Sequence, residues 1–219
     1  MSGALQAVFQ NQRSFIPPLP AAIGASFGGG FFAGQISTVG NSIADYNLVI
    51  GPVASAQSTL QFKTTNTSSP GTSSVINGPA NSAAMNDATH PAAEFCEGLT
   101  IGGFSDWYLP AKNELEVCYY NLKPTTTSND TGSGINPNAV PARASSYTAG
   151  TPAQTTAAAF VTITGAEAFT SFPGGWDYWS STEAGNPAKA YLQSFDTGSQ
   201  RFNIKDTAYR VRAVRRVAV

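Results

Sequence analysis

The sequence G-G-F-S-D-W-Y-L-P at residues 102–110 carries the strongest structural signal in the chain. Two further motifs follow it in order, Y-W-S-S-T-E at residues 178–183 and R-V-R-A-V-R-R at residues 210–216. None of the three supplies a nucleophile with a base, or a set of metal ligands. We interpret Asp106 and Trp107 as structural, because a Trp between a glycine turn and a helix start is typical of a packing anchor whose indole N–H needs one partner. The motifs predict a protein that binds rather than one that turns over a substrate.

Apolar residues recur at helical spacing on both sides of this stretch. Positions i, i+3, i+4 and i+7 hold Ala92, Phe95, Cys96 and Leu99 in the first set and Leu115, Cys118, Tyr119 and Leu122 in the second. This spacing predicts one helix over residues 91–99 and another over residues 111–122. Each cysteine lies in an apolar stripe, where a free thiol behaves as a small buried hydrophobe. Reduced cysteines are expected, and a disulfide stays open if the two helices pack together.

Other segments carry strand patterns. Residues 46–53 predict a strand that forms a hairpin with the Gly-rich segment 27–37. Residues 157–164 are a further candidate strand. The last third predicts an antiparallel meander with strands at 178–182, 190–196, 200–205 and 209–219. Its alternation slips at residues 213–214, and a β-bulge there would restore it.

Composition limits the class of protein. Of the 219 residues, 42% are apolar, so one domain with an extension can form a core. Only 11% are charged, against roughly 25% in typical soluble domains. The net charge of −1 gives no case for nucleic acid or an anionic membrane as partner. No apolar run approaches the roughly 20 residues of a membrane span. A polar, nearly uncharged surface is common in extracellular β-rich proteins and in virion proteins.

Half of the twelve basic residues lie in residues 201–219. They are Arg201, Lys205, Arg210, Arg212, Arg215 and Arg216. We expect them on a solvated strand face, or tied to carbonyls and carboxylates of the fold. A strip that binds a polyanion is the alternative.

Residues 1–25 predict an extended arm ahead of a domain at residues 26–219. The prolines of F-I-P-P-L-P at 15–20 favour extended backbone. We interpret the arm as a docking segment, with a disordered tail as the alternative. The first residues lack a basic start followed by an apolar stretch, so no secretory signal is predicted. This favours a virion protein, assembled in the host cytoplasm, over an exported bacterial protein.

The candidate binding residues follow a long polar loop. Residues 123–156 are rich in Thr, Ser, Asn, Pro and Gly, and a loop of that length in a compact domain is usually functional. The predicted ligand-binding residues are Trp176, Asp177, Tyr178, Glu183, Asn186 and Tyr191. Aromatic faces beside carboxylates and amides suit carbohydrate binding, because C–H faces stack and hydroxyls are hydrogen-bonded. Ordinary packing beneath a loop is the alternative.

Taken together, the motifs resemble the C-terminal domain of collagen-like bacterial adhesins, a C-type-lectin-like family also found in phage virion proteins. The resemblance rests on residues 102–110 after a helix with a Cys, a second helix with Glu114 and Leu115, W-S-S-T-E, an A-Y-x-x-x-F strand and V-R-A-V-R. It extends over residues 27–219. It implies an α+β, C-type-lectin-like fold in which two helices flank small twisted antiparallel sheets.

The resemblance also implies that the 27–37 strand lies beside the 209–217 strand, and that the protein is a homo-oligomer such as a trimer. No cofactor or metal is predicted, and calcium binding stays open. E-A-G-N-P at 183–187 lacks the Glu-Pro-Asn motif of calcium-dependent lectins, and T-S-N-D-T-G-S at 127–133 lacks EF-hand spacing. The related formylglycine-generating enzymes need active-site cysteines, and the single histidine, His90, has no evident nucleophile partner, so no enzyme is expected.

These observations predict a bacteriophage virion structural protein that displays a lectin-like domain for host attachment, as part of a tail fibre or tail tip or as a capsid decoration. Residues 1–25 would dock on other virion proteins. Loops 123–156 and 165–190 would face a host-surface glycan or protein. A bacterial surface adhesin domain is the first alternative, and a structural cement protein without a ligand is the second.

Overall fold

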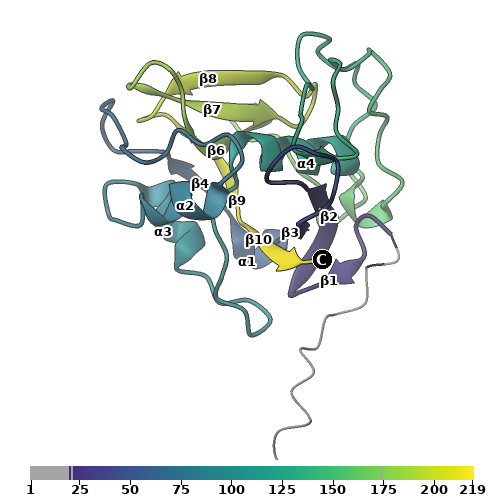
Figure 1. Ribbon diagram of the computed structural model, residues 1–219, viewed down its shortest axis with the longest axis horizontal. Coiled ribbons are helices and arrows are strands. Elements are labelled where there is room, and N and C mark those ends of the chain that lie inside the picture. The colour runs from purple at the N-terminus through teal and green to yellow at the C-terminus, as the bar shows by residue number, and fades with distance from the viewer. Residues whose placement is uncertain (1–19, 21, 174) are drawn as a thin grey trace, which may run out of the picture.

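Ten strands in two five-stranded sheets frame the part of the chain that the structure describes (Figure 1). The computed structural model describes residues 20, 22–173 and 175–219. The first sheet has the order β1 (Ser26–Phe27), β2 (Gly30–Ile36), β3 (Tyr46–Ile50) and β10 (Val214–Ala218), with β5 (Ala139–Val140) also paired to β2. The second has the order β4 (Gln57–Gln61), β9 (Ala208–Arg212), β6 (Asp177–Glu183), β7 (Lys189–Ser194) and β8 (Gln200–Ile204).

The helices of the described residues are short. They are α1 (Val53–Ala56), α2 (Gly78–Ala83), α3 (Pro91–Glu97), α4 (Lys112–Leu122) and the 3-10 turn η1 (Ala158–Phe160). The expected α+β, C-type-lectin-like fold is therefore wrong, because two sheets dominate the architecture. That fold was implied by the family resemblance. No strand was predicted at β4, whose residues are mostly half-buried and show no apolar alternation.

Residues 208–218 belong to both sheets. Their first part, β9, pairs with β4, and their second part, β10, pairs with β3. Between them, the Ala213 N–H donates to Ala56 O and the Ala213 carbonyl accepts from the Gly51 N–H, both at 2.9 Å. The predicted β-bulge is therefore wrong. The alternation slips because the chain leaves one sheet for the other.

Strand order departs from the prediction at two further places. The β6–β7–β8 meander is confirmed, but β9 lies beside β6, with Tyr178 opposite Arg210 in a parallel register. In the first sheet β3 pairs with β2, which confirms the hairpin. Because β3 also pairs with β10, it separates the two strands that were expected to be neighbours. Residues 157–164 contain η1 in place of the candidate strand.

Two clusters of buried side chains form the core. The first gathers around α4, which contacts β2 and β5 of one sheet and β6 and β7 of the other. The second contains Trp107 and Trp179. Trp107 is buried and its Nε1 donates to Phe104 O at 3.1 Å, which confirms the predicted anchor and its partner. Cys96 of α3 and Cys118 of α4 are free and buried, as expected, and burial raises the pKa of both thiols.

The predicted docking arm lies mostly outside the described residues, since residues 1–19 and 21 are not among them. Its last residues join the first sheet. The Gly24 N–H donates to Phe32 O at 2.8 Å, and the Phe32 N–H donates to Ala25 O at 2.9 Å. Each helix in the described ranges is too short or too polar to cross a bilayer.

Candidate functional site

Two of the six residues predicted to bind a ligand are buried in β6. Asp177 accepts hydrogen bonds from Arg201 Nη2 at 2.7 and 2.8 Å. Burial raises the pKa of Asp177, against the opposing effect of Arg201. The Tyr178 side chain is fully buried, and its hydroxyl accepts from the Thr170 backbone N–H at 3.0 Å. The polar groups of both residues are therefore engaged within the fold.

Glu183, at the end of β6, is also held by neighbours. Its carboxylate pairs with the buried Lys205 ammonium and accepts a hydrogen bond from Ser68 Oγ at 3.0 Å. Burial acts to raise the pKa of Glu183, but hydrogen bonds from Lys205, Ser69 and Ser68 lower it. Glu183 thereby fastens the polar loop at residues 64–74 to the second sheet.

The other three predicted residues are more accessible. Trp176 is half-buried against the first core cluster. Asn186 is exposed in the β6–β7 turn, where its Oδ1 accepts from the Ala188 N–H at 2.9 Å. Tyr191 lies in β7, opposite Phe202 of β8. Neither pocket described below is lined by any of the six, so their assignment to one ligand site stays a prediction.

Tyr191 contributes to an exposed surface that we call the β7–β8 face. It consists of Lys189, Tyr191, Phe202 and Ile204, which pair across the two strands. Phe202 is 52% exposed and Ile204 is 40% exposed. Lys189 Nζ lies 5.1 Å from the Phe202 ring centroid, and Lys112 Nζ of α4 lies 4.9 Å from that of Tyr191. Rings beside cations suit contact with a partner.

The long loop at residues 123–156 is held against α4 by a polar network around Glu116. This carboxylate accepts hydrogen bonds from Tyr147 OH and Asn136 Nδ2, each at 2.5 Å, and forms an ion pair with Arg143. Glu116 is fully buried, and burial raises its pKa despite Arg143 and the hydrogen bonds. All three partners lie in the loop, so one buried acid fixes several of its turns.

A second network fixes the middle of the loop. Asn129 Oδ1 accepts from Tyr119 OH at 2.5 Å and from Lys123 Nζ at 2.7 Å. Asn129 Nδ2 donates to the carbonyls of Thr148 at 3.1 Å and Pro152 at 2.9 Å. The side chains of Glu116 and Tyr119 thus attach the loop to α4, and Asn129 attaches it to itself, although its one strand is the short β5.

The anchored loop forms a surface pocket, which we call the loop pocket. Its lining residues are Tyr120, Arg143, Ala144, Ser145, Ser146, Tyr147, Thr148 and Thr151. Its volume is about 280 Å³. The Arg143 guanidinium carbon lies over the Tyr120 ring, 4.0 Å from its centroid, so a cation and an aromatic ring contact each other at the pocket wall. Most of the other lining residues carry hydroxyl groups.

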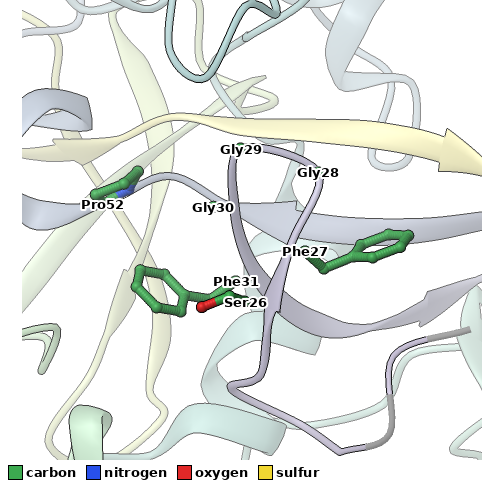
Figure 2. Close-up of a pocket in the computed structure, with 7 residues that line it drawn as sticks. All are labelled: Ser26, Phe27, Gly28, Gly29, Gly30, Phe31 and Pro52. Atoms are coloured by element: carbon green, nitrogen blue, oxygen red, sulfur yellow. The ribbon is translucent and has the colours of Figure 1, made fainter. Parts of the chain in front are cut away.

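Another pocket, of about 450 Å³, lies at the β1–β2 hairpin (Figure 2). It is lined by Ser26, Phe27, Gly28, Gly29, Gly30, Phe31 and Pro52. Figure 2 shows the Phe27 and Phe31 rings on opposite sides of the hairpin. Apart from the Ser26 hydroxyl, the lining is backbone and apolar side chains. Since binding sites orient ligands through a few well-placed polar groups, the loop pocket is the better candidate.

The fold also gives His90 a partner that the sequence analysis missed. Ser69 Oγ lies 3.0 Å from His90 Nε2, and His90 Nδ1 lies 3.0 Å from Asp87 Oδ1, which are the contacts of a hydrolase triad. Ser69, however, is only 2% exposed, and its Oγ also accepts from Lys205 Nζ at 3.1 Å. A nucleophile must reach its substrate, and the buried Ser69 cannot. We therefore interpret these contacts as structural, because they hold residues 64–74 against α3. Residues 69 and 90 are brought together by the fold, so no local motif marks them.

Every basic residue of the 201–219 segment has a partner. The pairs are Arg201 with Asp177, Lys205 with Glu183, Arg210 with Ser171 O, Arg212 with Glu167, Arg215 with Asp106 and Arg216 with Glu114. Arg215 binds both carboxylate oxygens of Asp106, at 2.7 and 2.9 Å. These contacts confirm that the arginines are tied to carboxylates and carbonyls. They argue against a polyanion strip, because most of the charges are compensated.

Comparison with known proteins gives a family match. The model of the Lcl C-terminal domain matches residues 53–215, within the range of the resemblance noted from the motifs. No curated protein sequence matches the chain. Among solved structures, a fimbrial protein from Bacteroides ovatus is similar, with a TM-score of 0.41 and 16% identity over 77% of this chain. The similar region covers 35% of that protein. A C-type-lectin-like family is not confirmed by these comparisons.

Proposed function

The chain belongs to the Lcl C-terminal domain family, and we propose that it is the recognition domain of a bacterial surface adhesin. The motif resemblance to the C-terminal domains of collagen-like adhesins supports this proposal. The observation that carries it is the loop pocket, an open site built on a loop that buried Glu116 holds in one conformation. Loops positioned by a rigid scaffold are the usual place for recognition residues.

Recognition without catalysis is part of the proposal. The buried Ser69 is supported as a structural residue by its hydrogen bonds to His90 and Lys205. A fluorophosphonate probe, which labels reactive serines, should leave Ser69 unmodified in the native protein. Covalent labelling at Ser69, detected by mass spectrometry, would instead assign a hydrolytic activity.

The direct test is attachment to cells. Fluorescently labelled protein should bind saturably to bacterial or cultured mammalian cells in flow cytometry. Thr148→Arg, which fills the exposed loop pocket, should weaken binding by about tenfold or more, or about 1.4 kcal/mol. Thr126→Arg adds the same charge to an exposed loop position outside the pocket lining and serves as the control. Absence of saturable binding to any cell, or equal binding by the two variants, would overturn the proposal.

The virion protein expected from the sequence stays a prediction. The location of the protein, on the cell envelope or on phage particles, distinguishes it from the adhesin proposed here. Immunogold electron microscopy of source cells and their phage particles, with antibody to residues 92–219, should place gold on the cell envelope. Gold on particles with a bare envelope would favour the virion protein, with residues 1–25 as its docking arm. The size of the assembled protein, measured by light scattering, tests the expected homo-oligomer in either case.

A further inference from the structure

We infer that the loop pocket binds one neutral sugar ring of the surface partner. The inference deepens the proposed function and rests on it. It concerns the chemistry of the ligand. The charge of the pocket, its hydroxyl groups and its size each restrict what that ligand can be.

Charge compensation in the pocket favours a neutral ligand. Arg143 is the charged residue among those that line the pocket. Its guanidinium forms an ion pair with Glu116, which is fully buried. A ligand in the pocket therefore meets a cation whose charge is already balanced, so an added anionic group would gain little from Coulomb attraction.

Hydroxyl groups supply the polar contacts. Ser145, Ser146, Thr148 and Thr151 line the pocket, and their hydroxyls form no hydrogen bond with another described residue. A hydroxyl both donates and accepts, so a group of four matches a ligand whose own groups do the same. The neighbouring hydroxyls of a sugar ring have this property, whereas an apolar ligand would leave the pocket groups unpaired.

The Tyr120–Arg143 wall and the small volume of the pocket suit a ligand of one ring. The Arg143 guanidinium lies over the Tyr120 ring, and the C–H face of a pyranose can pack against the outer side of this pair. The volume of about 280 Å³ is just below the roughly 300–1,000 Å³ of sites for drug-sized molecules. One sugar unit fits that size, and further units of a glycan would extend into solvent.

The pocket is also organised before a ligand arrives. The carbonyl of Thr148 accepts from Asn129 Nδ2, and the Thr148 and Thr151 backbones hydrogen-bond to each other at 3.2 Å. Tyr147 beside them is fixed by its hydrogen bond to Glu116. Little loop entropy is lost on binding, so a small ligand with few contacts can still bind measurably.

Saturation-transfer NMR on the full chain tests the inference directly. The probes are the methyl glycosides of glucose, galactose, mannose, fucose and N-acetylglucosamine, with methyl glucuronide as a charged analogue of the same shape. We expect saturation transfer to at least one neutral glycoside and little to the glucuronide. Thr148→Arg and Ser145→Arg, both at exposed positions, should weaken that binding by about tenfold, or about 1.4 kcal/mol. Thr126→Arg should change it by less than about 0.5 kcal/mol, as expected for a surface substitution away from the site.

Three results would overturn the inference: no binding of any neutral glycoside, stronger binding of the glucuronide, or unchanged binding by both pocket variants with native circular dichroism. Its failure is distinguishable from failure of the proposed function. If Thr148→Arg abolishes cell attachment while no glycoside binds, the pocket recognises a different chemistry and only the inference fails. If a glycoside binds in the pocket but no cell is bound, the adhesin proposal fails.

Discussion

The segment at residues 102–110 and the loop at residues 123–156 are both irregular, and their principal anchors differ: Trp107 in the first, and Glu116 with Asn129 in the second. Trp107 anchors the first by apolar burial, with a single hydrogen bond to its indole. Glu116 and Asn129 anchor the second through buried polar contacts. Apolar burial is non-directional, whereas hydrogen bonds restrict distance and angle. The first arrangement therefore contributes mainly stability, and the second contributes mainly a defined loop geometry.

The largest expected effect is that of Trp107→Ala. The substitution removes a large buried side chain from the second core cluster and should cost about 3–5 kcal/mol of unfolding free energy. Urea denaturation followed by circular dichroism measures this loss. A loss below about 1 kcal/mol, the average for a point substitution, would mean that Trp107 is not an anchor of the core.

Glu116→Gln should have a smaller, local effect. The amide keeps the shape but leaves Arg143 without its counter-charge and weakens three hydrogen bonds, for a loss of about 1–3 kcal/mol. Hydrogen exchange should accelerate at residues 129–152 while β2 and β3 stay protected. Glu94→Gln, at an exposed position of α3, is the matched control. Faster exchange throughout both sheets would show that the loop network belongs to the global core.

The pH dependence of stability provides a third test. Burial raises the folded-state pKa of Glu116 above the ordinary value of 4.5. The folded protein then binds this proton more tightly than the unfolded chain, so the contribution is present below pH 4.5 and is lost as pH rises through the folded pKa. Unfolding free energies measured from pH 4.5 upward should fall less steeply for Glu116→Gln than for the parent. Parallel curves would show that Glu116 does not titrate differently in the fold.

Asp87 should show the opposite slope with the smallest amplitude. Hydrogen bonds from Thr89 and then His90 lower its pKa from 3.8 to about 2. This contribution is present above pH 3.8 and is lost as pH falls toward 2. The effect is small because half of the Asp87 side chain is exposed. Asp87→Asn should make the unfolding free energy less dependent on pH at the acid end of the curve. An unchanged pH dependence would show that Asp87 does not help to hold residues 64–74.

The contrast between the two regions explains what could be predicted from the sequence. Apolar periodicity marked α3, α4 and both buried cysteines, because a helix that buries one stripe repeats its apolar residues. The Trp107 anchor and the single hydrogen-bond partner of its indole could be predicted, because Trp107 stands between a glycine turn and the start of a helix. The two-sheet architecture did not, because strand pairs such as β4 with β9 join residues far apart in sequence.

The candidate site was only partly predictable. The long loop rich in Thr and Ser was singled out from the sequence, and it contains most of the residues that line the loop pocket. Glu116, in contrast, lies on a helix whose sequence is typical of ordinary polar surface at that position. Its buried environment exists only once Arg143, Asn136 and Tyr147 fold over it. Asp177 and Tyr178 were chosen for their chemical types, yet these same types also complete buried hydrogen bonds. Whether such a residue binds a ligand or forms hydrogen bonds inside the protein depends on its burial, and burial is a property of the fold.

The position of residues 208–218 in both sheets has a consequence for synthesis of the protein. Every other strand precedes this segment in the chain, and both β9 and β10 are needed to complete their sheets. A nascent chain that has emerged from the ribosome only as far as residue 207 has β4 without β9 and β3 without β10. Completion of both sheets must therefore wait until translation has passed this point. Until then, the exposed edges of β3 and β4 are where a chaperone would be needed.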